Sequence, residues 1–399
     1  MTIVTSTREL EKVCAQIGES GRFGMDLEFI PERTYSPELC LVQVSTDRDA
    51  FIVDPLAVPD LMPLWEQVAD PGILKVLHAA EQDLDLVHSW SKLVPQNIMD
   101  IQIAAGFTGF GYPVGYGKLL NQLLSVSISK TESYTDWMNR PLTESQIHYA
   151  LDDVRHLLPM YDRLANRLRE GGRLGWVEEE CRRYCTPEYY EQDRSLDYLR
   201  VKGASSLPRR GLAVLQELCH FRDREAYRLN KPARSIIGDN ILLELSRRPP
   251  RQVDEIKRVR GVRPDQIRQY GEQIIKAVQQ ALNRPEDLCP TWPSFKTPPR
   301  REVLIGDILF AVQKTICYDL DLAPELVASR NDLQNLVRAH RESRVEESQV
   351  PLLEGWRRQI VGQALIDLLD GAQLEIQVVK GDPPVRMLVD PSTKVQSKI

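Results

Sequence analysis

Apolar and polar residues follow two different rhythms in the first part of the chain. Leu10, Val13 and Ile17 recur at helical spacing, whereas the segment 22–29 (RFGMDLEF) alternates apolar and polar residues as a strand does. The same criteria predict further strands at 39–45, 50–54, 73–79 and 97–100, and helices at 60–69, 81–90, 101–107, 116–124 and 143–169. Three meandering strands, then strands alternating with helices, predict an α/β fold in which helices cover both faces of a mixed sheet.

The apolar pattern is almost purely helical beyond about residue 170. We therefore expect the α/β domain to be followed by two all-α domains and joined to them by connecting segments. The predicted parts are the α/β domain 1–172, an acidic and aromatic helical connector 173–204, a domain of four or five helices 205–284, a linker with five prolines 285–300, a second helical domain 301–378 ending in a possible strand (LEIQVV), and a polar tail 379–399.

The composition is that of a globular protein without a membrane segment. Of the 399 residues, 42% are hydrophobic and 27% charged, and no run of about 18 apolar residues occurs. The N-terminus also lacks the charged and apolar regions of a secretory signal, so we expect a cytoplasmic protein. Seven cysteines without paired C-x-x-C motifs indicate reduced structural thiols rather than a zinc site.

The charge is unevenly distributed along the chain. The net charge is −6, but residues 201–284 hold 18 basic and 9 acidic side chains, while residues 1–200 hold 19 basic and 31 acidic ones. Ion pairs on a solvated helical surface would explain part of this basic excess, but not all of it. A basic segment between acidic ones predicts that the first helical domain contacts a polyanion such as nucleic acid.

Three carboxylates early in the chain are candidates for chemistry. Asp26 and Glu28 are two residues apart in a predicted strand, so their side chains project from the same face. Two acids on a central strand are costly to bury without a cation, although a strand end facing solvent would also accommodate them. Asp83 follows the strand 73–79 at the start of a helix, where acids are common for dipole reasons, and Asp85 is a nearby alternative.

A fourth carboxylate lies on the helix predicted to begin after Thr143. Thr143 and Gln146 form the T-x-x-Q pattern of a capping box. On this helix Tyr149 and Asp153 lie within about 40° of each other, on one face, whereas Asp152 points about 100° away from Asp153 and should be dispensable. The tyrosine and the acid are either a functional pair or an ordinary surface pair.

Hard oxygen ligands of this kind suit Mg²⁺ or Mn²⁺ better than zinc. Two such ions about 3.5–4 Å apart activate a water and stabilise the leaving oxygen of a phosphodiester. The sequence therefore offers Asp26, Glu28, Asp83 and Asp153 as ligands of two divalent ions. Tyr149 would orient the attacking water, since a phenol with a pKa near 10 is a poor base.

The wording of three motifs resembles the DEDD 3′→5′ exonuclease superfamily, and ribonuclease D within it. These motifs are MDLEF, LHAAEQDLDLV and YALDDVRHLLPMY, the last preceded by DWMNRPLTESQ. Residues 206–283 resemble an HRDC domain, and 301–372, with EGWRRQIVGQALIDLLDG, resemble a second, more divergent HRDC-like unit. The resemblance implies an RNase H-like sheet, metal ligands at Asp26, Glu28, Asp83 and Asp153, and a catalytic tyrosine at Tyr149.

The same resemblance implies an activity and partners. It implies a monomeric enzyme that removes nucleotides from RNA 3′ ends, releases 5′-mononucleotides, and processes tRNA precursors and other small structured RNAs. Two alternatives stay open at this point. A DNA-directed 3′→5′ exonuclease would share the motifs, because HRDC modules accompany both substrates, and a non-catalytic RNA-binding protein could keep the nuclease fold.

Other residues near the motifs have competing interpretations. HYALDDV also fits the pattern of a sister group in which a histidine, here His148, replaces the tyrosine. Helix geometry disfavours His148, because five residues place it about 140° from Asp153. We interpret His78 as a structural residue at a strand end, and Trp137 and Arg140 as residues that position the chain before the helix, with a substrate contact possible for Arg140.

Overall fold

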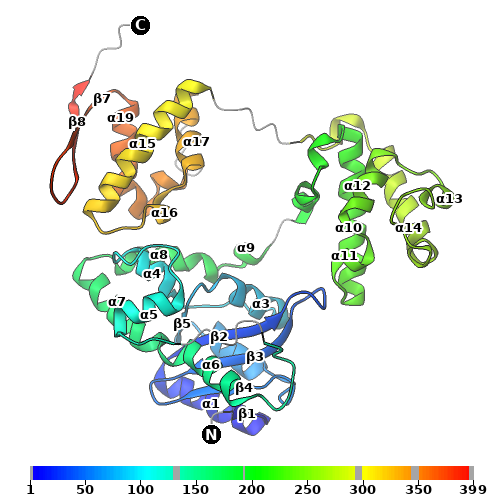
Figure 1. The fold of residues 1–399 in the computed structure, drawn as a ribbon, viewed down its shortest axis with the longest axis horizontal. Coiled ribbons are helices and arrows are strands. Elements are labelled where there is room, and N and C mark those ends of the chain that lie inside the picture. The colour runs from blue at the N-terminus through cyan, green and yellow to red at the C-terminus, as the bar shows by residue number, and fades with distance from the viewer. Residues whose placement is uncertain (1–2, 129–134, 192–193, 293–298, 343–349, 395–399) are drawn as a thin grey trace.

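A central six-stranded sheet organises the first domain in the computed structural model, which describes residues 3–128, 135–191, 194–292, 299–342 and 350–394 (Figure 1). The strands are β1 (Ile3–Val4), β2 (Arg22–Ile30), β3 (Glu38–Ser45), β4 (Ala50–Val53), β5 (Leu74–Leu77) and β6 (Ile98–Asp100). Their order is β1-β4-β3-β2-β5-β6. β2 pairs antiparallel with β3 and parallel with β5, so the sheet is mixed, as predicted.

Seven helices surround this sheet in the described part of the first domain. They are α1 (Thr7–Ser20), α2 (Met62–Ala69), α3 (Glu81–Ser91), α4 (Ile101–Gly106), α5 (Tyr116–Leu124), α6 (Glu144–Arg155) and α7 (Leu157–Glu170). The single helix predicted over 143–169 is wrong, because the chain breaks at His156 into α6 and α7. Pro159 explains the break: it has no N–H to donate to the carbonyl of Arg155, so the helical hydrogen-bond ladder is interrupted there.

Short helices connect the first domain to a helical unit with its own core. The connector contains α8 (Leu174–Arg182), η1 (Arg183–Cys185), α9 (Pro187–Tyr190), η2 (Arg194–Arg200) and η3 (Ala204–Ser206). The first helical unit contains α10 (Arg209–Leu229), α11 (Ala233–Ile236), α12 (Asp239–Arg247), α13 (Val253–Ile256) and α14 (Pro264–Asn283). Its buried residues form a cluster separate from the core of the first domain. One 3-10 turn, η4 (Glu286–Leu288), lies in the predicted linker.

The second helical unit contains α15 (Arg300–Asp319), α16 (Pro324–Val327), α17 (Arg330–Arg341), η6 (Pro351–Leu353), α18 (Gly355–Arg357), η7 (Arg358–Gly362) and α19 (Gln363–Leu369). Its buried residues belong to the same cluster as the core of the first domain. The polar tail predicted from residue 379 is partly wrong, because β7 (Ala372–Val378) pairs with β8 (Val385–Lys394) in a hairpin. No helix in the described ranges is long and apolar enough to cross a membrane.

Candidate active site

Asp26 and Glu28 lie on β2, near the middle of the sheet. Across the ladder they pair with Gln43 and Leu41 of β3, and a bulge follows Glu28. Because they are two residues apart, both carboxylates project from one face, as predicted. Gly24 makes room on the same strand: a Cβ there would lie 2.5 Å from Oγ of Ser45.

Helix α6 brings Asp153 to this strand. Thr143 and Gln146 form the predicted capping box, with the Gln146 N–H donating to Thr143 Oγ1 at 3.2 Å and the Thr143 N–H donating to Gln146 Oε1 at 2.9 Å. At the other end of the helix, Ser45 Oγ donates to the carbonyl of Val154 at 2.8 Å. The helix is therefore fixed at its start by its own cap and near its end by the sheet, next to Asp153.

Three of the four predicted ligands form one compact group. A carboxylate oxygen from each of Asp26, Glu28 and Asp153 lies within 4.8 Å of the other two. Asp83 is outside this group, but its side chain is only 7% exposed and its charge raises the pKa of Asp26 and Glu28. The fold therefore brings together the four acids that the sequence singled out, with Asp83 at the edge of the group.

The ionised form of these acids is disfavoured. Burial, followed by repulsion from Asp153 and Asp83, raises the pKa of Glu28 to about 8. Burial and then the charge of Asp100 raise the pKa of Asp83 to about 8, and burial and then Asp152 raise that of Asp153 to about 7. The pKa of Asp26 is likewise raised, by burial first. A divalent cation would reverse this balance, because it favours all the carboxylates in their charged form.

The donor set fits a hard cation. All four side chains offer carboxylate oxygens, with no thiolate or imidazole in the group of described residues that could hold a metal. Oxygen ligands of this kind suit Mg²⁺ or Mn²⁺. Asp85 is less suited, since burial and then Glu81 raise its pKa to about 6, while its charge raises the pKa of Tyr189 and Tyr190 on α9.

Tyr149 and His148 lie in different surroundings on α6. Tyr149 is half-buried, and its ring packs at 5.9 Å from that of Trp137, which is 5% exposed. The His148 side chain is exposed. The structure therefore gives the tyrosine a fixed position on this helix and leaves the histidine in solvent.

Arg140 anchors the segment that leads into α6. Its Nε and Nη2 donate to the Asp54 carboxylate at 2.6 and 2.8 Å, and its remaining N–H groups donate to backbone carbonyls, including those of Cys40 and Trp137. A guanidinium has five N–H donors, and these contacts use all five. Arg140 thus positions the chain before α6, as predicted, and a substrate contact through its guanidinium is not favoured.

Sequence analysis missed two polar side chains next to the acids. Tyr116 is mostly buried and its hydroxyl donates to the carbonyl of Asp152 at 2.6 Å, beside Asp153. His78 packs edge-on against Tyr116 with ring centroids 5.6 Å apart, and its Nε2 lies 2.9 Å from the carbonyl of Val114. The structural role predicted for His78 agrees with these contacts. Nothing in the segment GYPVGYGK distinguishes Tyr116, because its partner is 36 residues away.

The first helical unit carries an open groove of about 970 Å³. Four exposed arginines contribute to its lining: Arg247, Arg248, Arg258 and Arg260. Arg247 is paired with Glu244 at 2.7 Å, whereas the other three make no ion pair with any described residue. Other basic residues of this unit are structural, such as Arg222, which bonds Asp239 at 2.6 Å. The basic excess of the sequence is therefore partly used in ion pairs and partly exposed in this groove.

Comparison with known proteins identifies three parts of the chain. Residues 1–169 match the family described as 3′-5′ exonuclease, residues 211–278 the HRDC domain, and residues 307–365 the family described as ribonuclease D, C-terminal HRDC domain. The ribonuclease D of Gluconacetobacter diazotrophicus is 37% identical over 374 residues, which cover 93% of each protein. The ribonuclease D of Granulibacter bethesdensis is 34% identical, again with 93% of each protein covered.

A solved structure agrees with these matches. The crystal structure of Escherichia coli RNase D, described as an exoribonuclease involved in structured RNA processing, matches with a TM-score of 0.79 and 28% identity. The match covers 92% of this chain and 98% of that one. The chain therefore belongs to the ribonuclease D family of 3′→5′ exoribonucleases, with an exonuclease domain followed by two HRDC domains.

Proposed function

We propose that Asp26, Glu28, Asp83 and Asp153 hold two divalent ions, Mg²⁺ or Mn²⁺, at which RNA is hydrolysed from its 3′ end. The observation that carries this proposal is the group of carboxylate oxygens from Asp26, Glu28 and Asp153 within 4.8 Å of one another, in surroundings that raise the pKa of each acid. Such a group is costly without a cation and well suited to one. When bound, the ions supply a nucleophilic water at neutral pH and stabilise negative charge on the phosphate.

The chain's own groups place the reacting atoms. Tyr149, held against Trp137, orients the attacking water through its hydroxyl. The water oxygen attacks the terminal phosphorus, and the bond from phosphorus to the 3′ oxygen of the preceding nucleotide breaks. The water proton passes to solvent, and the leaving 3′ oxygen gains a proton. The products are a 5′-mononucleotide and an RNA shorter by one residue with a free 3′ hydroxyl.

The first helical unit is suited to hold the rest of the RNA. Its groove exposes Arg248, Arg258 and Arg260, which attract backbone phosphates with little sequence preference. The same unit touches the loop that follows β2: the ring of Tyr227 packs 5.7 Å from that of Tyr35, and the Ser36 N–H donates to Asn230 Oδ1 at 3.4 Å. A contact at the end of the strand that carries Asp26 and Glu28 supports delivery of RNA to the acids.

The substrates we propose are the 3′ ends of tRNA precursors and other small structured RNAs, processed in the cytoplasm by a monomer. The support is the family and the description of the Escherichia coli relative, which acts in structured RNA processing. A DNA-directed exonuclease and a non-catalytic RNA-binding protein are the alternatives that the test must exclude.

The test compares end-labelled single-stranded RNA and DNA, each with Mn²⁺, with Mg²⁺ and with a chelator. We expect stepwise shortening of RNA that requires the metal. Asp26→Ala and Asp153→Ala should lose activity by at least about 10²-fold while keeping the fold, as expected when a group that stabilises transition-state charge is removed. Asp152→Asn is the matched control and should keep activity, because its carboxylate pairs with Arg155 at 3.3 Å.

A further variant tests the role of the tyrosine. Tyr149→Phe keeps the ring against Trp137 and removes only the hydroxyl, so turnover should fall while Mn²⁺ binding is unchanged. Preferential loss of DNA would favour a DNA-directed enzyme. Full activity in Asp26→Ala and Asp153→Ala would refute the metal-ligand assignment, and intact RNA under every condition would favour the binding protein.

A further inference from the structure

The turn between β5 and α3 determines where Asp83 points. β5 ends at Leu77 and α3 begins at Glu81, with Asp83 in the first turn of the helix. Ala80 occupies the N-cap position, where its methyl group supplies no acceptor for the first helical N–H groups. Ala79 has a φ of 59°, a left-handed conformation that is unfavourable for a residue with a Cβ. This turn therefore needs a partner from elsewhere in the chain.

Asp100 supplies that partner. It is the last residue of β6 and pairs in register with Leu77. Its Oδ1 accepts from the Ala79 N–H at 3.0 Å and its Oδ2 from the Ala80 N–H at 3.0 Å. Oδ1 also accepts from the Gln102 N–H at 2.8 Å. Hydrogen bonds to an ionised acceptor are stronger than neutral ones, so three of them hold the turn firmly.

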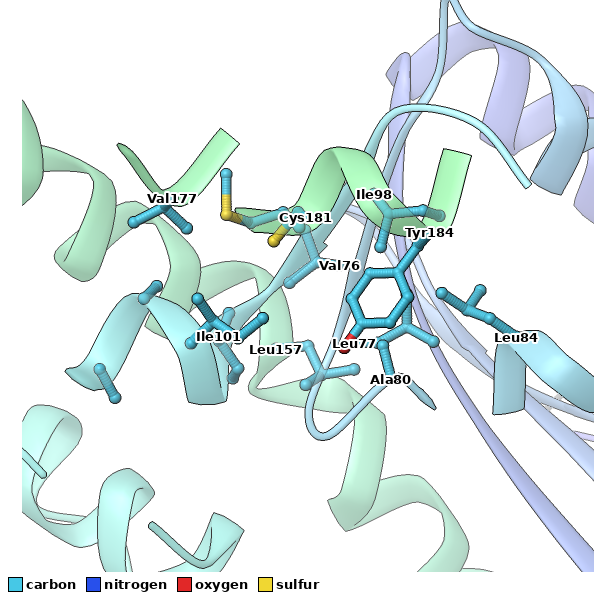
Figure 2. Packing of buried hydrophobic residues seen from close by; sticks show 14 of the residues in the cluster. Val76, Leu77, Ala80, Leu84, Ile98, Ile101, Leu157, Val177, Cys181 and Tyr184 are labelled. Carbon is cyan, nitrogen blue, oxygen red and sulfur yellow. The ribbon is translucent and has the colours of Figure 1, made fainter. Parts of the chain in front are cut away.

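The surroundings keep Asp100 in place and away from substrate. The residue is 2% exposed, and its N–H donates to Cys181 Sγ of α8 at 3.4 Å. Figure 2 shows Tyr184 directed toward Leu77 and Ala80, with Cys181 on the same side of the cluster. Asp100 is not in the metal-sized group of Asp26, Glu28 and Asp153. Its carboxylate oxygens are instead directed at the backbone of the turn.

We propose that Asp100 is a positioning residue for the metal ligand Asp83. By fixing the left-handed turn at Ala79 and the N-cap at Ala80, it sets the direction of the first turn of α3, and so directs the Asp83 carboxylate toward Asp26. The inference rests on the proposed function, because it takes Asp83 as a ligand. It adds a residue that touches neither metal nor RNA.

The test measures Mn²⁺ binding to the full-length protein by titration calorimetry, without RNA. In Asp100→Asn the amide nitrogen cannot accept, so at least one backbone N–H loses its acceptor. We expect Mn²⁺ binding to weaken by about 10- to 100-fold, the usual effect of losing a group that orients a ligand. Leu10→Ala, a cavity in α1 away from this turn, is the control for general destabilisation and should bind Mn²⁺ as the wild type does.

Substitutions at Ala79 test the mechanism separately, since this side chain is exposed. Glycine adopts positive φ without strain, so Ala79→Gly should restore part of the Mn²⁺ affinity lost in Asp100→Asn. Valine disfavours this φ, so Ala79→Val should weaken Mn²⁺ binding while Asp100 is intact. The Ala79→Val measurement decides the question even if Asp100→Asn does not fold.

The outcomes separate this inference from the proposed function. Wild-type Mn²⁺ affinity in Asp100→Asn or in Ala79→Val would overturn the positioning role, and so would equal weakening in Leu10→Ala. Wild-type protein that binds no Mn²⁺ would instead refute the proposed metal site, and the positioning role with it. Weaker binding in Asp100→Asn with recovery in the Ala79→Gly double variant would support both.

Discussion

The two helical units are attached to the exonuclease domain in different ways. In the second unit, Trp356 is 1% exposed, and its ring stacks 5.8 Å from that of Trp176 on α8. The neighbouring Arg357 makes a two-pronged ion pair with Glu180 of the same helix. The first unit has a core of its own. Figure 1 shows it set apart from the rest of the chain, and its contact at Tyr35 is peripheral.

This difference indicates a division of labour between domains of the same family type. A buried aromatic stack and a desolvated ion pair make the second unit part of one folding core with the exonuclease domain. The first unit has the exposed arginines and few contacts, so it is free to adjust to a bound RNA. The sequence hints at this division through charge alone: net +9 in 201–284, against an acidic remainder.

The largest effect should come from breaking the attachment of the second unit. Trp356→Ala removes a fully buried indole and should lower the free energy of unfolding by about 3–5 kcal/mol. Tyr227→Ala, the corresponding change in the first unit, removes an exposed ring and should cost less than about 1 kcal/mol. Urea denaturation followed by circular dichroism measures both. Similar losses in the two variants would contradict the proposed difference in attachment.

A smaller effect, on the order of 2 kcal/mol, should appear in the pH dependence of the metal-free protein. Glu28 and Asp83 have pKa values raised to about 8 in the folded state, against about 4 when unfolded. Between these values the folded protein binds more protons than the unfolded chain, so stability falls as pH rises. We expect the unfolding temperature to fall by about 5 °C from pH 5 to pH 8, and saturating Mn²⁺ to restore it.

The same experiment distinguishes the two units. The first helical unit has no described Asp or Glu with a raised pKa, so its unfolding transition should not move over this pH range. Asp83→Asn should stabilise the metal-free protein at pH 8 and flatten the pH dependence, because it removes one of the repelling charges. A metal-free protein that becomes more stable toward pH 8 would disprove the arrangement.

The smallest effect, about 1 kcal/mol per side chain, is expected for RNA binding by the first unit. Arg258→Gln and Arg260→Gln should weaken RNA binding across sequences and reduce the salt dependence by about 0.7 for each lost phosphate contact on a single strand. Arg330→Gln is the matched control in the second unit, where the arginine pairs with Asp307. Filter binding at several salt concentrations measures these changes. An equal loss in Arg330→Gln would remove the distinction between the units.

Local signals in the sequence predicted many of the elements well. The capping box of Thr143 and Gln146 set the start of α6, and alternation of apolar and polar residues placed β2. The break at His156 and the strand β8 were missed. The first needed the missing N–H of Pro159 to be weighed against a continuous apolar pattern, and the second depends on pairing with β7. The exact domain limits stay predictions.

The candidate site was predicted in its ligands but not in its supports. Asp26 and Glu28 share a face because a strand has period two, and Tyr149 and Asp153 because a helix has period 3.6. Asp100 and Tyr116 act through backbone groups 20 or more residues away, at Ala79, Ala80 and Asp152. No local periodicity encodes such contacts.

The sequence by itself determined the class of fold, the identity of the acids and the basic character of the first helical unit, because each depends on spacing or composition within one segment. Only the tertiary structure decided that three of these acids meet within 4.8 Å and that burial raises their pKa values. It also decided that one helical unit shares the exonuclease core while the other keeps its own. Desolvation and mutual repulsion depend on which surfaces pack together, and that packing joins residues far apart in the chain.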